Sequence, residues 1–469
     1  MDWRGLEWTQ FQHIFSTPTW GTHPFVKNNE FEYLSHTAVV VFGLMTSMMQ
    51  LIAFPGLLHR SAFIVGDIRH PTSDIRHPTS DIREGAMNLH FTQEEFDARL
   101  LEARRRINAH NLDGLLLFKQ ESMYYLTGYD TDGFVLFQTL FLGLNGVLTL
   151  VTRSADRVQA GYTSIIEDVR IWLDSGSENP ANDVRKMLDG HGMRGKRIGV
   201  EYDAYGLSAK RGQMLEVALE SFCELVDASD LLRQQRLVKS PAELNYMRKA
   251  GEICLAVQEE AVRLSVPGAF EGDIRAAMHR IIWSSDGDTP AHVWPMGSGP
   301  SALLVRYKSG GRCIGENDQV FHEFAASYRH YHAALTFALV TGQASPAHRA
   351  MFSVCREALQ ACEEVLRPGK TVSDVFEGHR RAFIAGGFED SYLNVCGYTM
   401  GAMFPPTWME NPLIREGEQQ ILKPGMVFFM HMLMVDRTNG HMMALGEQAV
   451  VTDGACELIT QAVDELVIN

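Results

Sequence analysis

Side chains capable of chemistry are concentrated in three stretches of the second half of the chain. The first, HEFAASYRHYHAAL (322–335), contains one carboxylate, Glu323, among histidines, an arginine and tyrosines. The second, GYTMGAMFPPTWMEN (397–411), adds a tyrosine and a tryptophan, and the third (426–450) contains His431. A carboxylate acts as a nucleophile or as a base toward water, and an imidazole carries protons near neutral pH. These residue types predict acid–base or covalent chemistry.

Strands are predicted to position these side chains. The patterns predict strands Gln319–Ala326 and Tyr331–Thr341, then a hairpin of Met426–Val435 and Met442–Thr452 that turns at Asn439-Gly440. Alternate side chains share a face of a strand, and a one-residue slip would exchange the two sets. If positions 323 and 334 face a cleft, then the following also face it: Phe321, Ala325, His332 and Thr336, with Phe429, His431 and Leu433 opposite Ala444, Gly446 and Gln448. His322 would point away.

Helices are expected on either side of these strands. Pro241 to about Leu264 is predicted to be helical, with Ser240 as N-cap and Glu243 closing a capping box. Further helices are predicted at Gly272–Ser284, Pro346–Leu366 and Val372–Gly386. Two helices followed by strands therefore occur twice, which is an internal repeat of organisation without sequence identity.

The region before these elements alternates strands and helices. A capping box at Thr92 and Glu95 starts a helix Thr92–Asn108. Strands then alternate with helices: strands at 114–118, 134–142, 146–151 and 197–201, and helices at 181–191 and 208–219. This pattern predicts a covered α/β domain over 87–232, followed by a second domain over 233–469. The fold class expected for the whole chain is α/β (α+β).

Residues 1–86 differ from the rest. Thr37–Leu58 is apolar and about long enough to span a bilayer, and the heptapeptide Asp67–Ser73 is repeated at Asp74–Ser80. We expect residues 1–86 to be an atypical extension outside the fold, with Met87 as the natural start. A membrane anchor is the alternative.

The composition narrows the function classes. The chain of 469 residues carries a formal net charge of −15, which argues against binding nucleic acid, because that requires clustered Lys and Arg. Seven scattered cysteines without a CxxC pair fit neither a disulfide framework nor a thiolate zinc site. We therefore expect a cytoplasmic protein whose core meets no membrane.

Ordered motifs in the chain resemble the pita-bread family, which includes methionine aminopeptidase, prolidase, aminopeptidase P and creatinase. They are Arg236–Ala250 (RLVKSPAELNYMRKA), Ser298-Gly-Pro300, Leu366–Gly369 (LRPG), Lys423–Phe428 (KPGMVF) and Val450–Asp453 (VVTD). The resemblance covers about 380 residues from Met87. It implies a creatinase-like N-terminal α/β domain, a pita-bread catalytic domain and a homodimer.

The resemblance also implies that the metal site of the family has been lost. The family's metallopeptidases hold two divalent metals with two Asp, one His and two Glu, and the metal pair activates a water. Here those positions fall on Glu323, Ala334, Tyr398, His431 and Gly446. Ala and Gly offer no ligating side chain, so we expect no metal and no cofactor. A mononuclear site from Glu323, His332 and His431 stays conceivable.

The first two stretches are similar to ectoine hydrolases, a metal-free branch that opens the ring of a cyclic amidinium carboxylate. The resemblance implies that Glu323 attacks the amidinium carbon or activates water, and that His332 or His431 protonates the departing nitrogen. Arg306 or Arg329 would bind the substrate carboxylate. Tyr398 completes the catalytic set. His330, Phe404 and Trp408 would contact the substrate, with Trp408 closing over the ring. Thr407, Arg306 and Phe337 depart from the branch's pattern, which leaves room for a different ring.

Structural roles are weighed beside these functional ones. Arg329 fits a surface charge beside a turn, Trp408 fits a loop cap, and His330, His332 and Arg306 fit structural roles as well as functional ones. The leading function is a metal-independent hydrolase of a small C–N compound similar to ectoine. The alternatives are a metallopeptidase that cleaves Xaa-Pro bonds and an inactive pita-bread binding module.

Overall fold

The computed structural model describes residues 88–176 and 179–469. The predicted extension, with its apolar stretch and its repeat, lies outside the described residues. Across the two described ranges, none of the helices combines the length and the apolar character needed to cross a bilayer.

A six-stranded mixed sheet organises the first part of the described chain, in the order β4-β3-β2-β1-β5-β6. Its elements are α2 (Gln93–Ala109), β1 (Gly114–Leu117), α3 (Gln120–Thr127), β2 (Thr139–Gly143), β3 (Leu148–Thr152), α4 (Asp156–Thr163), β4 (Asp168–Ile171), α5 (Pro180–Gly190), β5 (Arg197–Val200), α6 (Ala209–Leu219), β6 (Glu224–Asp227) and α7 (Leu231–Arg236). β1 is fully buried because α2, α3 and α4 cover one face of the sheet while α5 and α6 cover the other. The predicted covered α/β arrangement is confirmed.

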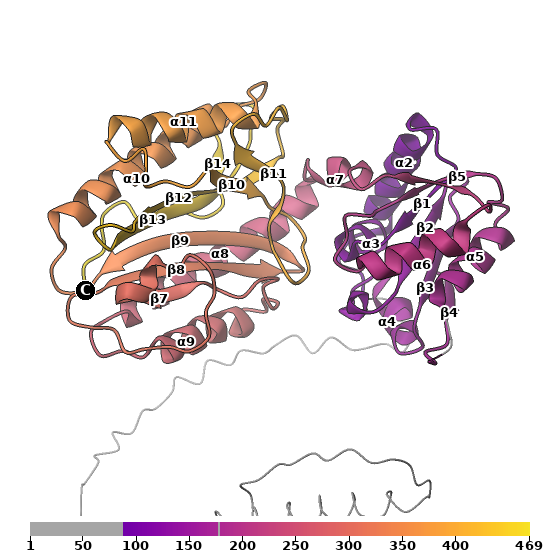
Figure 1. Ribbon diagram of the computed structural model, residues 1–469, viewed down its shortest axis with the longest axis horizontal. Helices are drawn as coiled ribbons and strands as arrows, with labels where there is room; N and C mark the ends of the chain where they lie inside the picture. Colours follow the sequence, from indigo (N-terminus) through magenta and orange to yellow (C-terminus); the bar gives the residue numbers. More distant parts are fainter. Residues whose placement is uncertain (1–87, 177–178) are drawn as a thin grey trace, which may run out of the picture. The chain divides into compact units, whose positions relative to one another are not determined.

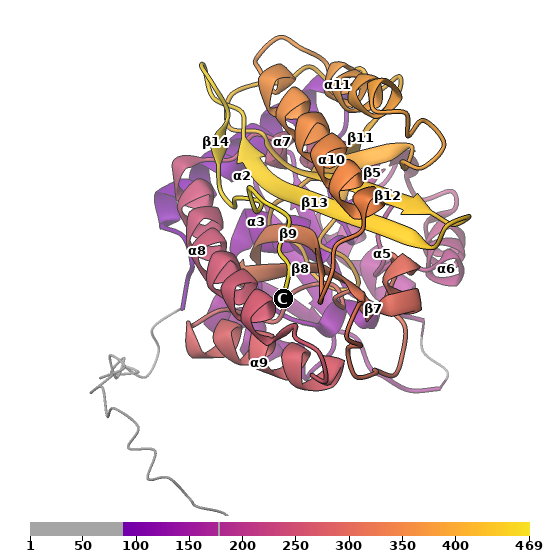
Figure 2. The same ribbon diagram turned by 90° about the vertical axis from the view of Figure 1, so that its left-hand side faces the viewer.

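An antiparallel sheet organises the second part, in the order β11-β10-β12-β13-β9-β8-β7 with β14 paired to β13. Its elements are α8 (Pro241–Leu264), α9 (Glu271–Ser284), β7 (Met296–Ser298), β8 (Gln319–Tyr328), β9 (Tyr331–Val340), α10 (Pro346–Val365), α11 (Val372–Ala385), β10 (Val395–Thr399), β11 (Glu410–Arg415), β12 (Val427–Asp436), β13 (His441–Val450) and β14 (Glu457–Leu458). Figure 1 shows α8 and α9 on one side of this sheet and α10 and α11 on the other. In Figure 2, α10 lies over β13 and α8 runs beside β8 and β9. The predicted repeat of two helices and then strands is present.

The predicted helix starts are confirmed by their caps. The Ser240 hydroxyl accepts a hydrogen bond from the backbone N–H of Glu243, whose carboxylate accepts one from the backbone N–H of Ser240. Thr92 and Ser345 cap α2 and α10. Each such cap stabilises its helix by about 1 kcal/mol.

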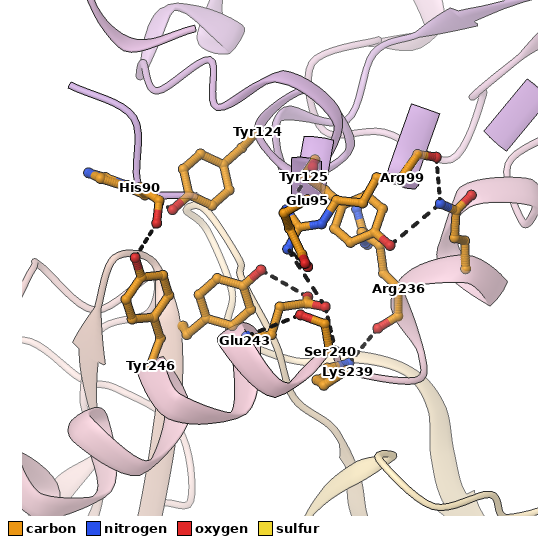
Figure 3. Close-up of polar contacts among 12 residues, drawn as sticks. His90, Glu95, Arg99, Tyr124, Tyr125, Arg236, Lys239, Ser240, Glu243 and Tyr246 are labelled. Carbon is orange, nitrogen blue, oxygen red and sulfur yellow. Dashed lines mark hydrogen bonds and ion pairs between the residues drawn. The ribbon is translucent and has the colours of Figure 1, made fainter. Parts of the chain in front are cut away.

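Buried charges join the first sheet's helices to α8 (Figure 3). The Arg99 guanidinium on α2 lies between the rings of Phe91 and Tyr125 and 3.8 Å from the Glu243 carboxylate. The Tyr331 hydroxyl donates to the same carboxylate at 2.9 Å. Glu243 therefore serves as helix cap and as ion-pair partner, which a cap motif alone does not reveal.

A second buried pair joins α7 to β11. The Arg236 guanidinium donates to the Glu410 carboxylate and, at 3.0 Å, to the Ser122 hydroxyl on α3. Both charged side chains are almost fully buried. The predicted boundary between 232 and 233 falls inside α7, and it stays a prediction.

Candidate active site

Four residues in register form a row across the second sheet. Glu323 on β8 pairs with Thr336 on β9, Thr336 pairs with Gly446 on β13, and Gly446 pairs with His431 on β12. Paired residues of neighbouring strands point to the same face. The row therefore has small residues in the middle and a carboxylate and an imidazole at its ends. We call these four residues and the side chains around them the cup.

Glu323 is a perturbed acid in the cup. Burial raises its pKa to about 7, and the positive charge of Arg306 opposes this rise. The side chain keeps partial solvent access, and its backbone N–H donates to the Pro295 carbonyl. A carboxyl group with a pKa near neutrality exchanges a proton in either direction at physiological pH.

Tyr398 and Trp408 close one side of the cup. The Trp408 indole N–H donates to the Tyr398 hydroxyl at 2.8 Å, and both side chains are buried. Burial and the charge of Glu323 hold the pKa of Tyr398 well above its usual value, so the phenol keeps its proton. The charge of Glu323 raises the pKa of Tyr398 and the charge of Arg306 lowers it, so the three groups act on one another electrostatically.

His431 and Arg306 differ in accessibility. Burial, assisted by Arg306, lowers the pKa of His431 to about 4, so its ring is neutral at pH 7, and its Nδ1 has no hydrogen-bond partner in the described chain. Its ring centroid lies 5.7 Å from that of Tyr398. Arg306 is exposed, lies in a loop, and forms no ion pair with the described residues. Its guanidinium is therefore available to an anionic substrate.

His332 shares the face of the row but lies far along it. It is four residues along β9 from Thr336, a separation of roughly 13 Å in a strand. Its Nε2 accepts a hydrogen bond from the backbone N–H of Ala291 at 2.9 Å, and burial lowers its pKa to about 3. This geometry favours a structural role for His332, which binds the Ala291 backbone. The imidazole that lies in the row with Glu323 is His431.

Arg329, His330 and Phe404 form a separate cluster at the β8–β9 turn. Arg329 and His330 adopt positive φ angles there, and the Arg329 guanidinium bonds Asp286 at 2.9 Å. The His330 ring donates to Asp130 at 2.9 Å and stacks on Phe404. Phe404 also meets the rings of Tyr124 and Phe134 edge-on, and the ion pair with the exposed Asp286 gives Arg329 the surface role considered above. Their predicted contact with substrate stays a prediction.

Two of the three residues that depart from the ectoine hydrolase pattern have local structural explanations. Phe337 points to the opposite face of β9 from Thr336 and packs against Phe324 and His322 beneath α8. The Thr407 hydroxyl accepts the backbone N–H of Met409 and so shapes the loop before Trp408. Of the three departures, Arg306 is therefore the one whose charge acts on the cup.

The donor set does not fit a metal centre. Within the described part of the chain, no group of three or more His, Cys, Asp or Glu side chains lies close enough together to hold a metal ion. A Cβ at Gly446 would stand 2.6 Å from the Met430 carbonyl oxygen and 2.9 Å from the His431 Cα, so the backbone leaves no room for a side chain. Ala334 is fully buried beside the Gln448 amide. We therefore assign no step to a metal.

Sequence reasoning missed the segment that supports Glu323 and His332. Residues 289–295 bring the backbone N–H of Ala291 to His332 and the carbonyl of Pro295 to Glu323. The sequence of this segment, TPAHVWP, offers no signal for such a role, because the segment forms no helix or strand and its contacts are made by backbone atoms.

The two parts of the described chain match two domains of the creatinase and prolidase type. The model of metallopeptidase family M24 matches residues 245–453, and that of the creatinase/prolidase N-terminal domain matches 99–238. An uncharacterized hydrolase/peptidase of Sinorhizobium fredii is 30% identical over 394 residues, covering 81% of this chain and 99% of the relative. The chain belongs to family M24.

Other relatives include two kinds of enzyme. An ectoine hydrolase of Halomonas elongata is 28% identical over 403 residues, covering 82% of this chain and 99% of that protein. The structure of the dipeptidase PepE from Mycobacterium ulcerans is 24% identical and covers 81% of this chain and 99% of that one, with a TM-score of 0.71. The structure of an Xaa-Pro dipeptidase from Bacillus anthracis is 18% identical and covers 80% of this chain and 100% of that one, with a TM-score of 0.70. These likenesses confirm the predicted fold.

Proposed function

We propose that this protein is a metal-independent hydrolase that opens a C–N bond of a small cyclic amidine carboxylate, ectoine or a related compound. The observation that carries the proposal is Glu323, whose pKa of about 7 makes it both base and acid in a cup that lacks a metal-ligand set. The likeness to an ectoine hydrolase supports the choice of substrate class.

The charges of the cup suit an amidinium carboxylate. The ionised Glu323 attracts the amidinium, and the exposed Arg306 binds the carboxylate at the mouth. The strands that bear Glu323 and His431 are three positions apart in the sheet, roughly 14 Å if the sheet were flat. That spacing leaves room for one small ring between the two side chains.

The reaction requires both protons of the water to leave its oxygen. Glu323 takes the first proton as the water oxygen forms a bond to the amidinium carbon, and returns it to the ring nitrogen as the C–N bond breaks. The hydroxyl group on the carbon then gives its proton to the released amine, leaving an amide and an ammonium group. Tyr398 keeps its phenolic proton and donates a hydrogen bond to the addition intermediate. Neutral His431 orients the nitrogen by hydrogen bonding.

A covalent route uses the same residues. Glu323 would attack the amidinium carbon directly, and the ring C–N bond would break as the departing nitrogen takes a proton from water. The hydroxide left from that water would then hydrolyse the O-acyl imidate that joins the substrate to Glu323. A single turnover in H₂¹⁸O distinguishes the two routes. Water attack labels the product amide in the first turnover, whereas the covalent route leaves the first product unlabelled when water cleaves the O-acyl imidate at the Glu323 carbonyl.

One experiment tests the proposal against its alternatives. The chelator-treated full chain is incubated with ectoine, creatine and Xaa-Pro dipeptides, and the products are followed by NMR. Ring opening by the wild type, its loss in Glu323→Gln and its retention in the exposed control Glu416→Gln support the proposal. Dipeptide hydrolysis that requires added Mn²⁺ or Co²⁺ would instead establish a peptidase. No turnover of any substrate would favour a binding module.

Cytoplasmic location and a homodimer remain part of the proposal. Size-exclusion chromatography with light scattering tests the dimer, and a mass of one chain would overturn it.

A further inference from the structure

An apolar recess lies beside the cup. Its volume is about 570 Å³, which is within the range of roughly 300–1,000 Å³ that small-molecule sites occupy. Its walls come from α9, from residues 289–294, from Tyr307 and from the loop before Trp408. The apolar and aromatic surfaces are supplied by His279, Val293, Trp294, Tyr307, Pro405 and Pro406.

Backbone and ring contacts join the recess to the cup. The His292 ring N–H donates to the Pro406 carbonyl at 2.8 Å, and the same ring meets Trp408 edge-on at 5.2 Å. The Trp408 indole N–H in turn donates a hydrogen bond to the Tyr398 hydroxyl. Tyr307 directly follows Arg306, the cation whose field acts on Glu323. The walls of the recess are therefore linked to the cup through Trp408 and through the step from Tyr307 to Arg306.

The lining points to an uncharged aromatic or branched group as occupant. No carboxylate lines the recess, and its cation, Arg275, bonds the Gly310 carbonyl. The rings of His279 and Trp294 stack in parallel with centroids 4.0 Å apart, which provides a flat aromatic wall. The Trp294 indole N–H is buried and has no hydrogen-bond partner in the described chain. Val293 and Tyr307 are half exposed at the rim, as expected of a recess that opens to incoming ligands.

We infer that this recess binds an apolar substituent of the substrate, of phenyl or branched-chain size, carried by the same molecule whose amidinium carbon lies at Glu323. The inference rests on the proposed function and deepens it. Ectoine places only a methyl group on its amidinium carbon, which would leave the recess unfilled. The preferred substrate is therefore a cyclic amidine carboxylate with a larger apolar group.

The test compares two substrates that differ in one group. The full chain is assayed with ectoine and with its analogue bearing phenyl in place of methyl, and kcat/KM is measured for both. Val293→Trp at the rim fills the recess, and Val217→Trp, on the exposed face of α6, is the matched control. Isothermal titration of both compounds onto the same proteins measures binding without catalysis.

The expected result is a wild-type preference of at least tenfold for the phenyl compound, lost in Val293→Trp and kept in Val217→Trp. Equal values for the two compounds, or a preference that Val293→Trp leaves intact, would overturn the inference. If neither compound is hydrolysed but the phenyl compound binds tenfold tighter in a Val293-dependent way, the recess is established and the proposed reaction fails. If ectoine is hydrolysed and the phenyl compound neither binds nor reacts, the reaction stands and the recess assignment fails.

Discussion

The Trp408 indole N–H donates to the Tyr398 hydroxyl at 2.8 Å, and the two side chains are buried together. An indole N–H is only a donor, so it occupies an acceptor position of the hydroxyl. The phenolic proton of Tyr398 is thereby directed elsewhere, toward the cup in which Glu323 and Arg306 act on it.

Tyr398→Phe is expected to lower kcat for ring opening by roughly 10²–10³, since it removes a donor that strengthens in the transition state. It also leaves the buried Trp408 N–H unpaired, which costs about 1–3 kcal/mol of unfolding free energy. Kinetics and urea unfolding measure the two effects. The double variant Tyr398→Phe/Trp408→Phe recovers stability without recovering activity. Recovery of both would show that Tyr398 acts only through the fold.

The pH profile of kcat/KM is expected to rise to a plateau with a midpoint near pH 7. The carboxylate form of Glu323 is the active one, and its pKa is raised to about 7. His431, with its pKa lowered to about 4, does not change its protonation between pH 5 and 9, so it adds no second transition to the profile. Initial rates across that range provide the check. A flat profile, or a midpoint below pH 5, would exclude Glu323 as the group that must ionise.

Glu323→Gln is expected to stabilise the protein at alkaline pH. The raised pKa means that the folded state binds more protons than the unfolded state between about pH 4.5 and 7, so wild-type stability falls as pH rises through that window. Glutamine avoids this loss, which amounts to about 1–3 kcal/mol above pH 7 after allowance for partial solvent access, and to nearly nothing at pH 4. Thermal unfolding of the wild type and of Glu323→Gln at pH 4 and pH 8 tests the sign of the stability difference. A variant less stable than the wild type at pH 8 would contradict the raised pKa.

Metal removal is expected to leave ring opening unchanged. Ala334 and Gly446 offer no side-chain donor, and the backbone around Gly446 leaves no space for one. Activity after chelation, with metal content measured by mass spectrometry, is the direct assay. Activity lost on chelation and regained with a divalent cation would refute metal independence.

Arg236→Met is expected to destabilise the protein by about 3–5 kcal/mol, because it leaves the Glu410 carboxylate buried without its partner. The double variant Arg236→Met/Glu410→Met should lose less, since neither charge is then stranded. Arg380→Met breaks an exposed pair with Glu377 and serves as the control whose unfolding midpoint stays in place. Equal effects at Arg236 and Arg380 would show that the buried pair adds no stability.

Long periodic elements were predictable from the sequence. α8, α10 and α11 carry N-terminal caps and apolar periodicity, and their predicted limits differ from the structure by at most one residue. The hairpin register was also predictable: His431 pairs with Gly446 and Leu433 with Ala444, as the alternation and the Asn439-Gly440 turn required. The short helices α3 and α4 were not predicted, because eight residues form little more than two turns and show too little helical periodicity.

The candidate site was predictable only in part. Glu323, Tyr398, Trp408, Arg306 and His431 came from motif positions, and the structure groups them by shared electrostatics and contacts. The separation of His332 and His330 from Glu323 depends on distance along β9 and on the turn, which alternation alone does not measure. The support from residues 289–295 could not be predicted, since it uses backbone groups that every residue has.

The crowding around Gly446 limits which residues this position accepts. A carboxylate here would require β12 and β13 to separate, because the Met430 carbonyl oxygen would lie 2.6 Å from any Cβ. An acidic residue in place of the fully buried Ala334 would also have to displace its neighbours. Two further carboxylates in the cup would therefore need changes in the strands themselves as well as in the two side chains.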